Sequence, residues 1–431
     1  MAKAFNVTGA CIPEEHYMVR LDERLREIRE LVDAGKYFSV NRARQYGKTT
    51  VLMALERYLQ NVYRVVLLDF QTFDAEKFRS GSAFAAAFAK SFLRALRRDK
   101  EEGSQAFQAA LSRLQECAQG GRGEFALMEL FEELSDICAA ADRPIVLMID
   151  EVDSAADNQV FMDFLAQLRA YYIRRSLQPT FRSVILAGVC DVKNLRRKLR
   201  PEEEHKVNSP WNIATDFKID MSFSPGDIEG MLEEYDSDYG IGMDIGRMAN
   251  LIHAYTSGYP FLVSRLCKLM DEEIGGTQGR GALENSVKKR AWTEDGFQKA
   301  VRVILSEKNT LFESLTGELT GYPTLNGMLR ALLFTGRSIV YNADDPAMDA
   351  ATMFGFIRNQ CGVAVIANRI FETRLYNYYL SLAEMQGLEI YKASLQDRNR
   401  FIVDGHLDMR LVLESFAIHF NDLYGDRGEA F

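Results

Sequence analysis

The pattern of apolar and polar residues changes period repeatedly along the first half of the chain. Short apolar runs between polar residues are typical of strands buried in a parallel sheet; they cover residues 37–40, 63–70, 145–149, 183–190 and 213–221. Between them, apolar residues recur at helical spacing, which predicts helices over residues 21–34, 51–59, 82–98, 105–117, 124–140 and 158–175. The alternation predicts an α/β fold with a parallel sheet flanked by helices.

The second half of the chain has a different pattern, which indicates further domains. Residues 224–274 are wholly helical, with Ser224 and Asp227 spaced as a capping box, and a glycine-rich linker begins at residue 275. Beyond Trp292 come two long helices, further short helices, a hairpin pattern over residues 356–367 and a helix over residues 369–382. We therefore predict a sheet domain (1–222), a helical lid (223–276), a winged-helix domain (291–385) and a C-terminal helical segment (386–431).

A polar, glycine-containing turn connects the first strand to the next helix. The turn ends in Gly47-Lys48-Thr49-Thr50, and the helical pattern starts immediately afterwards. Backbone N–H groups at such a helix start bind phosphate, the lysine supplies a full charge, and the first threonine can hold Mg²⁺. The match to the complete pattern G-x-x-x-x-G-K-[ST] lacks one glycine, because Arg42 occupies that position. The alternative interpretation is a glycine turn that begins an ordinary helix.

Two acids follow the strand that ends at residue 149. They favour the interpretation that the turn at residues 47–50 binds phosphate. Asp150 and Glu151 stand at the carboxyl end of this strand, where parallel sheets bind ligands. Asp150 is the candidate Mg²⁺ ligand, and Glu151 is the candidate base that orients or deprotonates the attacking water. At least one strand separates the loop from these acids along the chain, as in ATPases with an added strand and a catalytic glutamate. Two acids in an ordinary loop are the alternative.

Other segments are candidates for contacts with the nucleotide. His16, Tyr17, Met18 and Val19 precede the first helix and are candidates for stacking on a base, with simple packing as the alternative. Asp191 follows the strand at residues 183–190, where a group that senses the γ-phosphate is expected. Because an acid repels phosphate, we expect Asp191 instead to order the site through Mg²⁺, water or a neighbouring arginine. A basic run over residues 193–200 is either a solvated helix face, a source of an arginine that reaches the phosphate, or a nucleic-acid contact.

Composition restricts the class of protein further. The chain has 431 residues, 47% of them hydrophobic, and a formal net charge of −9, so a nucleic-acid contact requires a local basic patch. The cysteines are far apart and form no C-x-x-C motif, which favours reduced thiols: Cys11, Cys117, Cys138, Cys190, Cys267 and Cys361. Neither a signal-peptide pattern nor a membrane-spanning apolar run is present. We therefore expect a cytoplasmic protein without a membrane partner.

Taken together, these motifs resemble those of bacterial AAA-like ATPases. The loop NRARQYGKTT (41–50) and the strand VLMIDEVD (146–153) carry the resemblance. Further matching segments are HYMV (16–19), ILAGVCDVKN (185–194), NSPWNIA (208–214), SGYPFLVSRLCKLMDE (257–272), NRIFETRLYNYYL (368–380) and GHLDM (405–409). The resemblance covers essentially the whole chain, and members of this family are similar in lacking the first loop glycine.

The resemblance implies particular roles for residues of this chain. Lys48 is implied to contact the β- and γ-phosphates of ATP, Thr49 and Asp150 the Mg²⁺, while Gly47 shapes the loop. Gly258-Tyr259-Pro260 is similar to the Gly-x-Pro element of origin-recognition-like and related signalling ATPases, in which the proline packs on the adenine. Longer members continue into a PD-(D/E)XK nuclease-like domain. This sequence ends where that domain is expected to begin, so we expect no nuclease activity.

Three functional hypotheses follow from the sequence. The first is an ATP-dependent switch with slow, Mg²⁺-dependent hydrolysis, in which the nucleotide controls the lid and the winged helix. The second is a winged-helix module that binds DNA through Arg358, Arg369 and Arg374. The third is an interaction scaffold that has lost nucleotide dependence. A homo-oligomer and an effector protein are further candidate partners.

Overall fold

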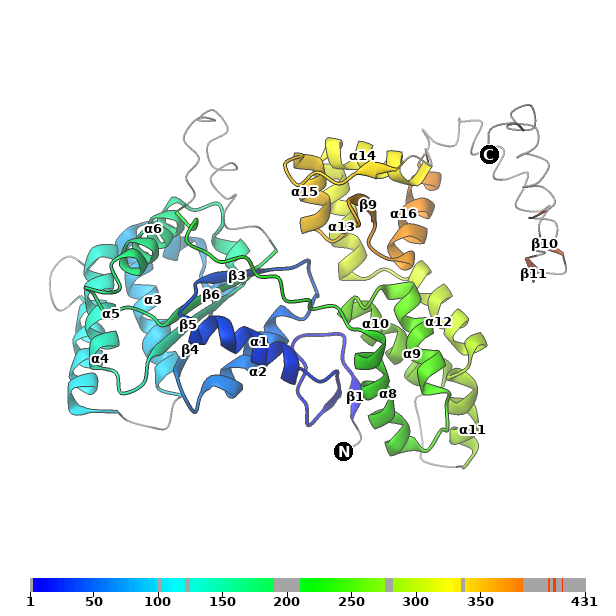
Figure 1. Cartoon of the computed structure of the whole chain (residues 1–431), viewed down its shortest axis with the longest axis horizontal. Helices are drawn as coiled ribbons and strands as arrows, with labels where there is room; N and C mark the ends of the chain where they lie inside the picture. Colours follow the sequence, from blue (N-terminus) through cyan, green and yellow to red (C-terminus); the bar gives the residue numbers. More distant parts are fainter. Residues whose placement is uncertain are drawn as a thin grey trace. The chain divides into compact units, whose positions relative to one another are not determined.

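The structure is a computed structural model that describes residues 3–98, 103–120, 125–189, 210–275, 282–334, 338–382, 402–403, 406–407 and 413. The chain divides into two compact units, Met1–Ile370 and Phe371–Phe431. The first unit contains the sheet domain, the lid and the helices and strands that follow the lid as far as Ile370 (Figure 1).

A parallel sheet of four strands forms the centre of the first domain. Its strands are β3 (Phe38–Asn41), β4 (Arg64–Asp69), β5 (Ile145–Asp150) and β6 (Ser183–Gly188), and their order in the sheet is β3-β6-β5-β4. Strands β5 and β6 are buried along their whole length, as their continuous apolar sequences predict. Because β3, β6 and β5 run parallel, the loop after β3 and the acids after β5 lie at the same edge of the sheet, with only β6 between them.

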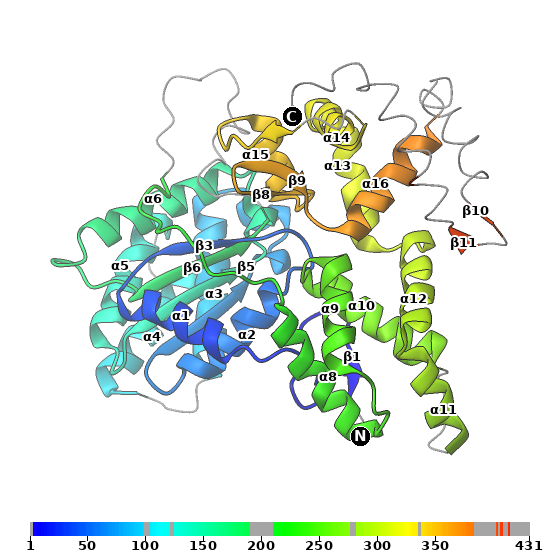
Figure 2. The same cartoon turned by 45° about the vertical axis from the view of Figure 1, so that its right-hand side comes forward.

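Helices cover both faces of this sheet (Figures 1 and 2). On one face, α1 (Asp22–Asp33) and α2 (Lys48–Leu59) pack on Val146, Met148 and other strand residues. On the other face, the alternate strand residues Leu147 and Ile149 pack on four helices: α3 (Gly81–Leu96), α4 (Gln105–Ala118), α5 (Leu127–Ala140) and α6 (Gln159–Ile173). Successive side chains of a strand point to opposite faces, so each strand serves two apolar layers. The predicted α/β fold is confirmed.

The strand predicted over residues 213–221 is wrong in extent, because a single parallel bridge, Phe38 to Thr215, takes its place. Beyond Thr215, backbone carbonyls that a strand would use in the sheet are bound by arginines. The carbonyl of Ile219 accepts from Arg42, and the carbonyl of Asp220 accepts from Arg24. These bonds take the place of sheet pairing, so side chains from α1 and from the loop after β3, both distant in sequence, overrode the local strand pattern.

The helical lid is built from α8 (Pro225–Tyr239), α9 (Ile245–Thr256) and α10 (Pro260–Lys268), which continues into a π-helical segment, Leu269–Ile274. The expected capping box is present, because Ser224 Oγ accepts from Asp227 N and the Asp227 carboxylate accepts from Ser224 N. Gly258 separates α9 from α10 with φ +72°, and an added Cβ would lie 2.1 Å from the carbonyl oxygen of Phe223. The turn between these helices therefore requires glycine.

The region after the lid contains helices and a small antiparallel sheet. The helices are α11 (Ala282–Ala291), α12 (Glu294–Ser306), α13 (Thr310–Gly321), α14 (Pro323–Phe334), α15 (Pro346–Met353) and α16 (Arg369–Ser381). The sheet has the order β7-β9-β8, with β7 (Ile339–Val340), β8 (Ile357–Gln360) and β9 (Val363–Ile366). The predicted hairpin at residues 356–367 is present, and a winged helix remains the interpretation we predict for this region.

Two short strand pairs complete the description. At the amino end, β1 (Ala4–Phe5) pairs in parallel with β2 (His16–Tyr17), which the sequence pattern did not predict. In the second unit, β10 (Ile402–Val403) pairs antiparallel with β11 (His406–Leu407), whereas the remaining residues of the predicted helical segment 386–431 lie outside the described residues, apart from residue 413. In the described part of the chain, no helix has the length and apolar character needed to cross a bilayer.

Candidate functional site

The loop between β3 and α2 has the backbone shape expected of a phosphate-binding turn. Gly47 is the residue before α2 and has φ +79°, and Gln45 is also left-handed, with φ +55°. Helix α2 starts immediately after Gly47, so its first N–H groups and the positive end of its dipole are directed at the loop.

Arg42 occupies the position of the missing first glycine without entering the loop. Its guanidinium donates to the carbonyl oxygens of Asn41 (2.8 Å) and Ile219 (2.8 Å) and lies over the ring of Phe217. Arg42 is not left-handed, in contrast to Gln45. A side chain is tolerated at residue 42 because it is anchored to the segment that leads to the lid.

Lys48 is buried at the start of α2, and its ammonium group folds back over the loop. The Nζ atom donates to the carbonyl oxygens of Arg42 (3.0 Å) and Ala43 (3.1 Å). Burial lowers the pKa of Lys48 below its ordinary value, while the carboxylates of Glu151, Asp153 and Asp150 counteract part of this effect. The loop thus holds a desolvated positive charge beside its own backbone.

Thr49 and Asp150 meet at the end of β5. The Thr49 hydroxyl donates to Asp150 Oδ2 at 2.6 Å, and Asp150 Oδ1 accepts from Glu151 N at 2.9 Å. A hydroxyl and a carboxylate are oxygen ligands that suit Mg²⁺, which keeps several waters and needs few protein ligands. This donor pair therefore fits the predicted metal, although in the described residues no group of three or more His, Cys, Asp or Glu is arranged as a metal site.

Glu151 has a left-handed backbone, with φ +53° and ψ +42°, which is uncommon for a residue other than glycine or asparagine. Burial, and next the charge of Asp150, raise the pKa of the Glu151 carboxyl above its ordinary value, and Lys48 opposes this. Burial likewise raises the pKa of Asp150, against the hydrogen bond from Thr49. The two acids and Lys48 therefore form one coupled group of charges.

The end of β6 is fitted closely against these acids. Asp153 Oδ2 accepts from Val189 N at 2.6 Å, and a Cβ on Gly188 would lie 2.8 Å from Val152 Cγ2. Glycine at residue 188 thus allows the segment after Glu151 to pack against β6. Asp191 and the basic run at 193–200 lie outside the described residues.

A cavity of about 390 Å³ adjoins the loop on the side of Gly47 and Thr50. Its lining includes Tyr17, Met18 and Pro260 as well as Gly47 and Thr50, so the predicted base-binding residues surround one space. Val19 also lines this cavity, whereas His16 does not, since its Nδ1 accepts from Ile12 N. The ring of Tyr17 packs against Phe5 and Tyr235, and its hydroxyl donates to Asp238. The volume is in the range of small-molecule sites.

The amino-terminal segment is a wall of this cavity that sequence reasoning missed. Asn6, Val7, Thr8, Gly9 and Cys11 line the cavity, and Cys11 N donates to Thr50 Oγ1 at 3.1 Å. Two-residue strands carry no usable periodicity, so no local signal placed this segment beside the loop.

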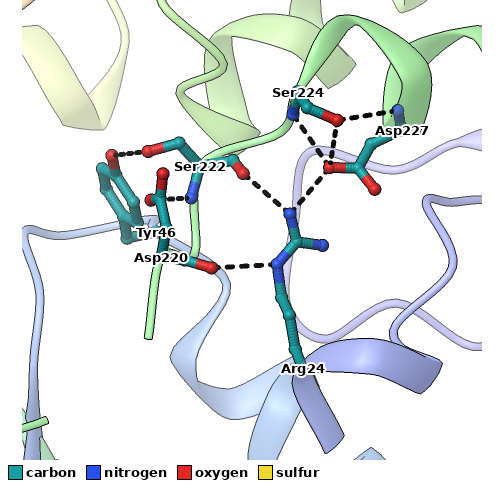
Figure 3. A network of polar contacts seen from close by, with 6 residues as sticks. All are labelled: Arg24, Tyr46, Asp220, Ser222, Ser224 and Asp227. Atoms are coloured by element: carbon teal, nitrogen blue, oxygen red, sulfur yellow. Dashed lines mark hydrogen bonds and ion pairs between the residues drawn. The ribbon is translucent and has the colours of Figure 1, made fainter. Parts of the chain in front are cut away.

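A polar network joins the loop and α1 to the segment that leads into the lid (Figure 3). Arg24 donates to the carbonyl oxygens of Asp220 and Ser222 and to the carboxylate of Asp227, at 3.0, 2.7 and 2.7 Å. The hydroxyl of Tyr46, in the loop, lies 2.9 Å from Ser222 Oγ. Arg24 and Tyr46 also line the 390 Å³ cavity, so groups beside the candidate base site hold the connection to the lid.

Two of the basic residues predicted to contact DNA, Arg358 and Arg369, are exposed residues of the first unit. Arg369 lies over the ring of Tyr255 at 4.3 Å, and Arg358 lines a second cavity beside the loop. Arg374 belongs to the second unit.

The chain matches one family and several solved structures. A sequence model described as AAA-like domain matches residues 12–316, which include the loop, the acids and the lid. No curated protein matches the chain. The Walker-type ATPase PABY2304 of Pyrococcus abyssi has a similar structure, with a TM-score of 0.55 and 14% identity over 86% of this chain and 99% of that protein.

Other similar structures have lower TM-scores. The ORC2 protein of Aeropyrum pernix in its ADP form has a TM-score of 0.43 and 10% identity, over 87% of this chain and 97% of that one. The RuvB Holliday junction branch migration motor of Thermotoga maritima has a TM-score of 0.39 and 12% identity, over 84% and 95%. At these identities the solved structures show the fold alone, whereas the sequence match spans most of the chain. The chain belongs to the AAA-like domain family.

Proposed function

We propose that this chain binds ATP with Mg²⁺ and hydrolyses it slowly to ADP and phosphate, and that the bound nucleotide controls the lid. One observation carries the proposal: Lys48, Thr49 and Asp150 converge at one edge of the sheet, beside a cavity that shares Gly47 and Thr50 with the loop. The base fits the cavity next to Met18 and Pro260, and the phosphates follow the loop towards Lys48.

Each residue has a defined part in this reaction. The N–H groups at the start of α2 and the Lys48 ammonium bind the phosphates, while Thr49 and Asp150 hold the metal. Mg²⁺ supplies charge neutralisation at the phosphate oxygens. Glu151 orients a water molecule and takes its proton as the water oxygen bonds to the γ-phosphorus and the bond to ADP breaks. We propose slow turnover because, within the described residues, no arginine is bonded in place at Thr49 or Glu151.

Control of the lid is supported by the network around Arg24. A nucleotide in the cavity touches the surroundings of Arg24 and Tyr46, which bind the backbone and side chain of the segment at residues 220–222. Contacts that differ between ATP and ADP would therefore shift the equilibrium of the lid. DNA binding stays a prediction: Arg358 and Arg369 are exposed, although Arg358 also lines the second cavity and Arg369 lies over the ring of Tyr255.

The proposal is tested by titration calorimetry with ATP·Mg²⁺ on the wild type, Lys48→Ala and Lys90→Ala. Lys90 is an exposed lysine of α3 and serves as the matched control. Loss of the ammonium beside the phosphates should weaken binding at least tenfold, about 1.4 kcal/mol, whereas Lys90→Ala should bind like the wild type. Equal affinity of Lys48→Ala and wild type, or no binding by the wild type, would overturn the proposal.

A further inference from the structure

A second cavity, of about 690 Å³, also borders the phosphate-binding loop. Asn41, Arg42 and Ala43 of the loop line it, together with Val189 at the end of β6. Tyr46 and Phe223 line both this cavity and the 390 Å³ cavity, so they separate the two spaces. The second cavity thus borders residues 41–43 at the start of the loop, whereas the 390 Å³ cavity borders Gln45 and Gly47 at its end.

The position of Lys48 indicates which part of a nucleotide would reach this cavity. Its ammonium is held by the carbonyl oxygens of Arg42 and Ala43, which are lining residues of the second cavity. The lysine of such a loop binds the β- and γ-phosphates. The terminal phosphate of a bound triphosphate would therefore lie at the mouth of the second cavity.

Two basic side chains from outside the sheet domain line the same space. Arg358 comes from β8 and His253 from α9. Burial, followed by the nearby charge of Arg358, lowers the pKa of His253, so the two groups are close enough to repel. In the described part of the chain, neither forms an ion pair with a carboxylate, although Asp220 and Asp349 also line the cavity. The hydrogen bond from Arg358 goes to its strand neighbour Gln360, at 3.4 Å.

The turn that precedes β8 packs closely against the phosphate-binding loop. Gly355 has φ +78°, and a Cβ at this residue would lie 2.8 Å from Cβ of Ala43. Ala43 is accordingly only 5% exposed. A movement of the loop around a phosphate would therefore be transmitted to Gly355 and to the strand that carries Arg358.

We propose that Arg358 binds the terminal phosphate of the bound nucleoside triphosphate, so that the small sheet β7-β9-β8 distinguishes ATP from ADP. This inference rests on the proposed ATP binding. A guanidinium forms paired hydrogen bonds with phosphate oxygens, and the anion relieves the repulsion between Arg358 and His253. Loss of the terminal phosphate removes the contact and frees β8 from the loop.

The test compares the affinities for ATP·Mg²⁺ and ADP·Mg²⁺ by calorimetry in the wild type, Arg358→Ala, Arg358→Lys and Arg302→Ala. Arg302 is an exposed arginine of α12 and is the matched control. Arg358→Ala should reduce the preference for ATP over ADP at least tenfold and leave the affinity for ADP unchanged, which also shows that the variant is folded. Arg358→Lys should recover part of the preference, and Arg302→Ala should retain all of it.

Two results would overturn the inference while leaving the proposed function intact. One is a wild type that binds ATP and an Arg358→Ala variant with the same ATP-to-ADP preference. The other is an Arg358→Ala variant that loses affinity for ATP and ADP equally. Arg358 would then stabilise the site without contacting the terminal phosphate. A wild type that binds neither nucleotide would instead refute the proposed function itself.

Discussion

Glu151 shows how a single residue combines backbone strain with a chemical role. Its left-handed backbone directs its N–H group onto Asp150 Oδ1, so the conformations of the two acids depend on each other. Strain of this kind at a non-glycine residue is common at functional sites, where the surrounding structure maintains it. Here β6 and Asp153 provide the support, through the bond from Val189 N and the close packing at Gly188.

The first prediction concerns the pH dependence of hydrolysis. Because burial and Asp150 raise the pKa of Glu151, the proposed base becomes protonated at a higher pH than an ordinary glutamate, whose pKa is about 4.3. Activity should therefore fall as the pH drops through this raised pKa. Glu151→Gln should keep ATP affinity and lose roughly 10²–10⁴-fold in kcat. Single-turnover phosphate release across pH measures the pH dependence and the loss of hydrolysis rate in Glu151→Gln. A wild-type rate in Glu151→Gln would contradict the role of Glu151 as the base.

At the scale of elements, one arginine of α1 makes three of the hydrogen bonds in the connection between the sheet domain and α8. Arg24 binds two backbone carbonyls and the carboxylate of Asp227, which is also the capping-box acid of α8 (Figure 3). Burial raises the pKa of Asp227, but the bonds from Ser224 N and Arg24 outweigh it, so the pKa lies below its ordinary value. A lowered pKa contributes stability above the unfolded-state pKa, about 3.9, which is lost as the pH falls through the folded-state pKa.

The second prediction follows for Arg24→Gln, with Arg26→Gln as control. Arg26 lies on the same helix, and its side chain is 64% exposed. At pH 7, Arg24→Gln should lower the free energy of opening at the start of α8 by about 1 kcal/mol. The difference should decrease once Asp227 is protonated, because the bonds to the carbonyls of Asp220 and Ser222 then remain. Hydrogen exchange of residues 225–232 at pH 7 and in acid measures it. A difference that is independent of pH would show that Asp227 does not contribute.

At the scale of the molecule, the amino-terminal segment connects the loop to the lid. The ring of Phe5 lies 5.0 Å from that of Tyr17, 5.1 Å from Tyr235 and 5.9 Å from Trp292. A few residues later, Cys11 binds Thr50 of α2. The segment therefore positions one wall of the candidate base cavity while its first strand packs on the lid.

The third prediction tests this connection with Phe5→Ala. Removal of this buried ring should cost about 3–5 kcal/mol of stability and weaken ATP binding. ATP·Mg²⁺ at a hundred times Kd should stabilise the wild type by about 2.7 kcal/mol, and the variant less at the same concentration. Thermal unfolding with and without nucleotide measures both, with Leu177→Ala, at an 83% exposed residue, as control. If Phe5→Ala is less stable but binds ATP like the wild type, the amino-terminal segment does not contribute to the ATP site.

Local sequence was sufficient for most elements, but not for those that depend on distant partners. The sequence of each of these segments records which of its own side chains are buried: all of them in β5 and β6, and one face in the helices α3 to α6. The segment 213–221 has equally apolar alternation, yet Arg24 and Arg42 bind its carbonyls and draw it away from the sheet. Neither arginine is close to it in sequence.

The sequence by itself determined the α/β fold, because periodicity and turn chemistry act within a few residues. It placed Lys48 and Thr49 at the start of a helix and Asp150 and Glu151 at the end of a strand. The tertiary structure alone decided that residues 6–9 and Cys11 line the candidate base cavity and that Arg358 lines a cavity beside the loop. These positions result from packing between segments far apart in the chain, which no local pattern records.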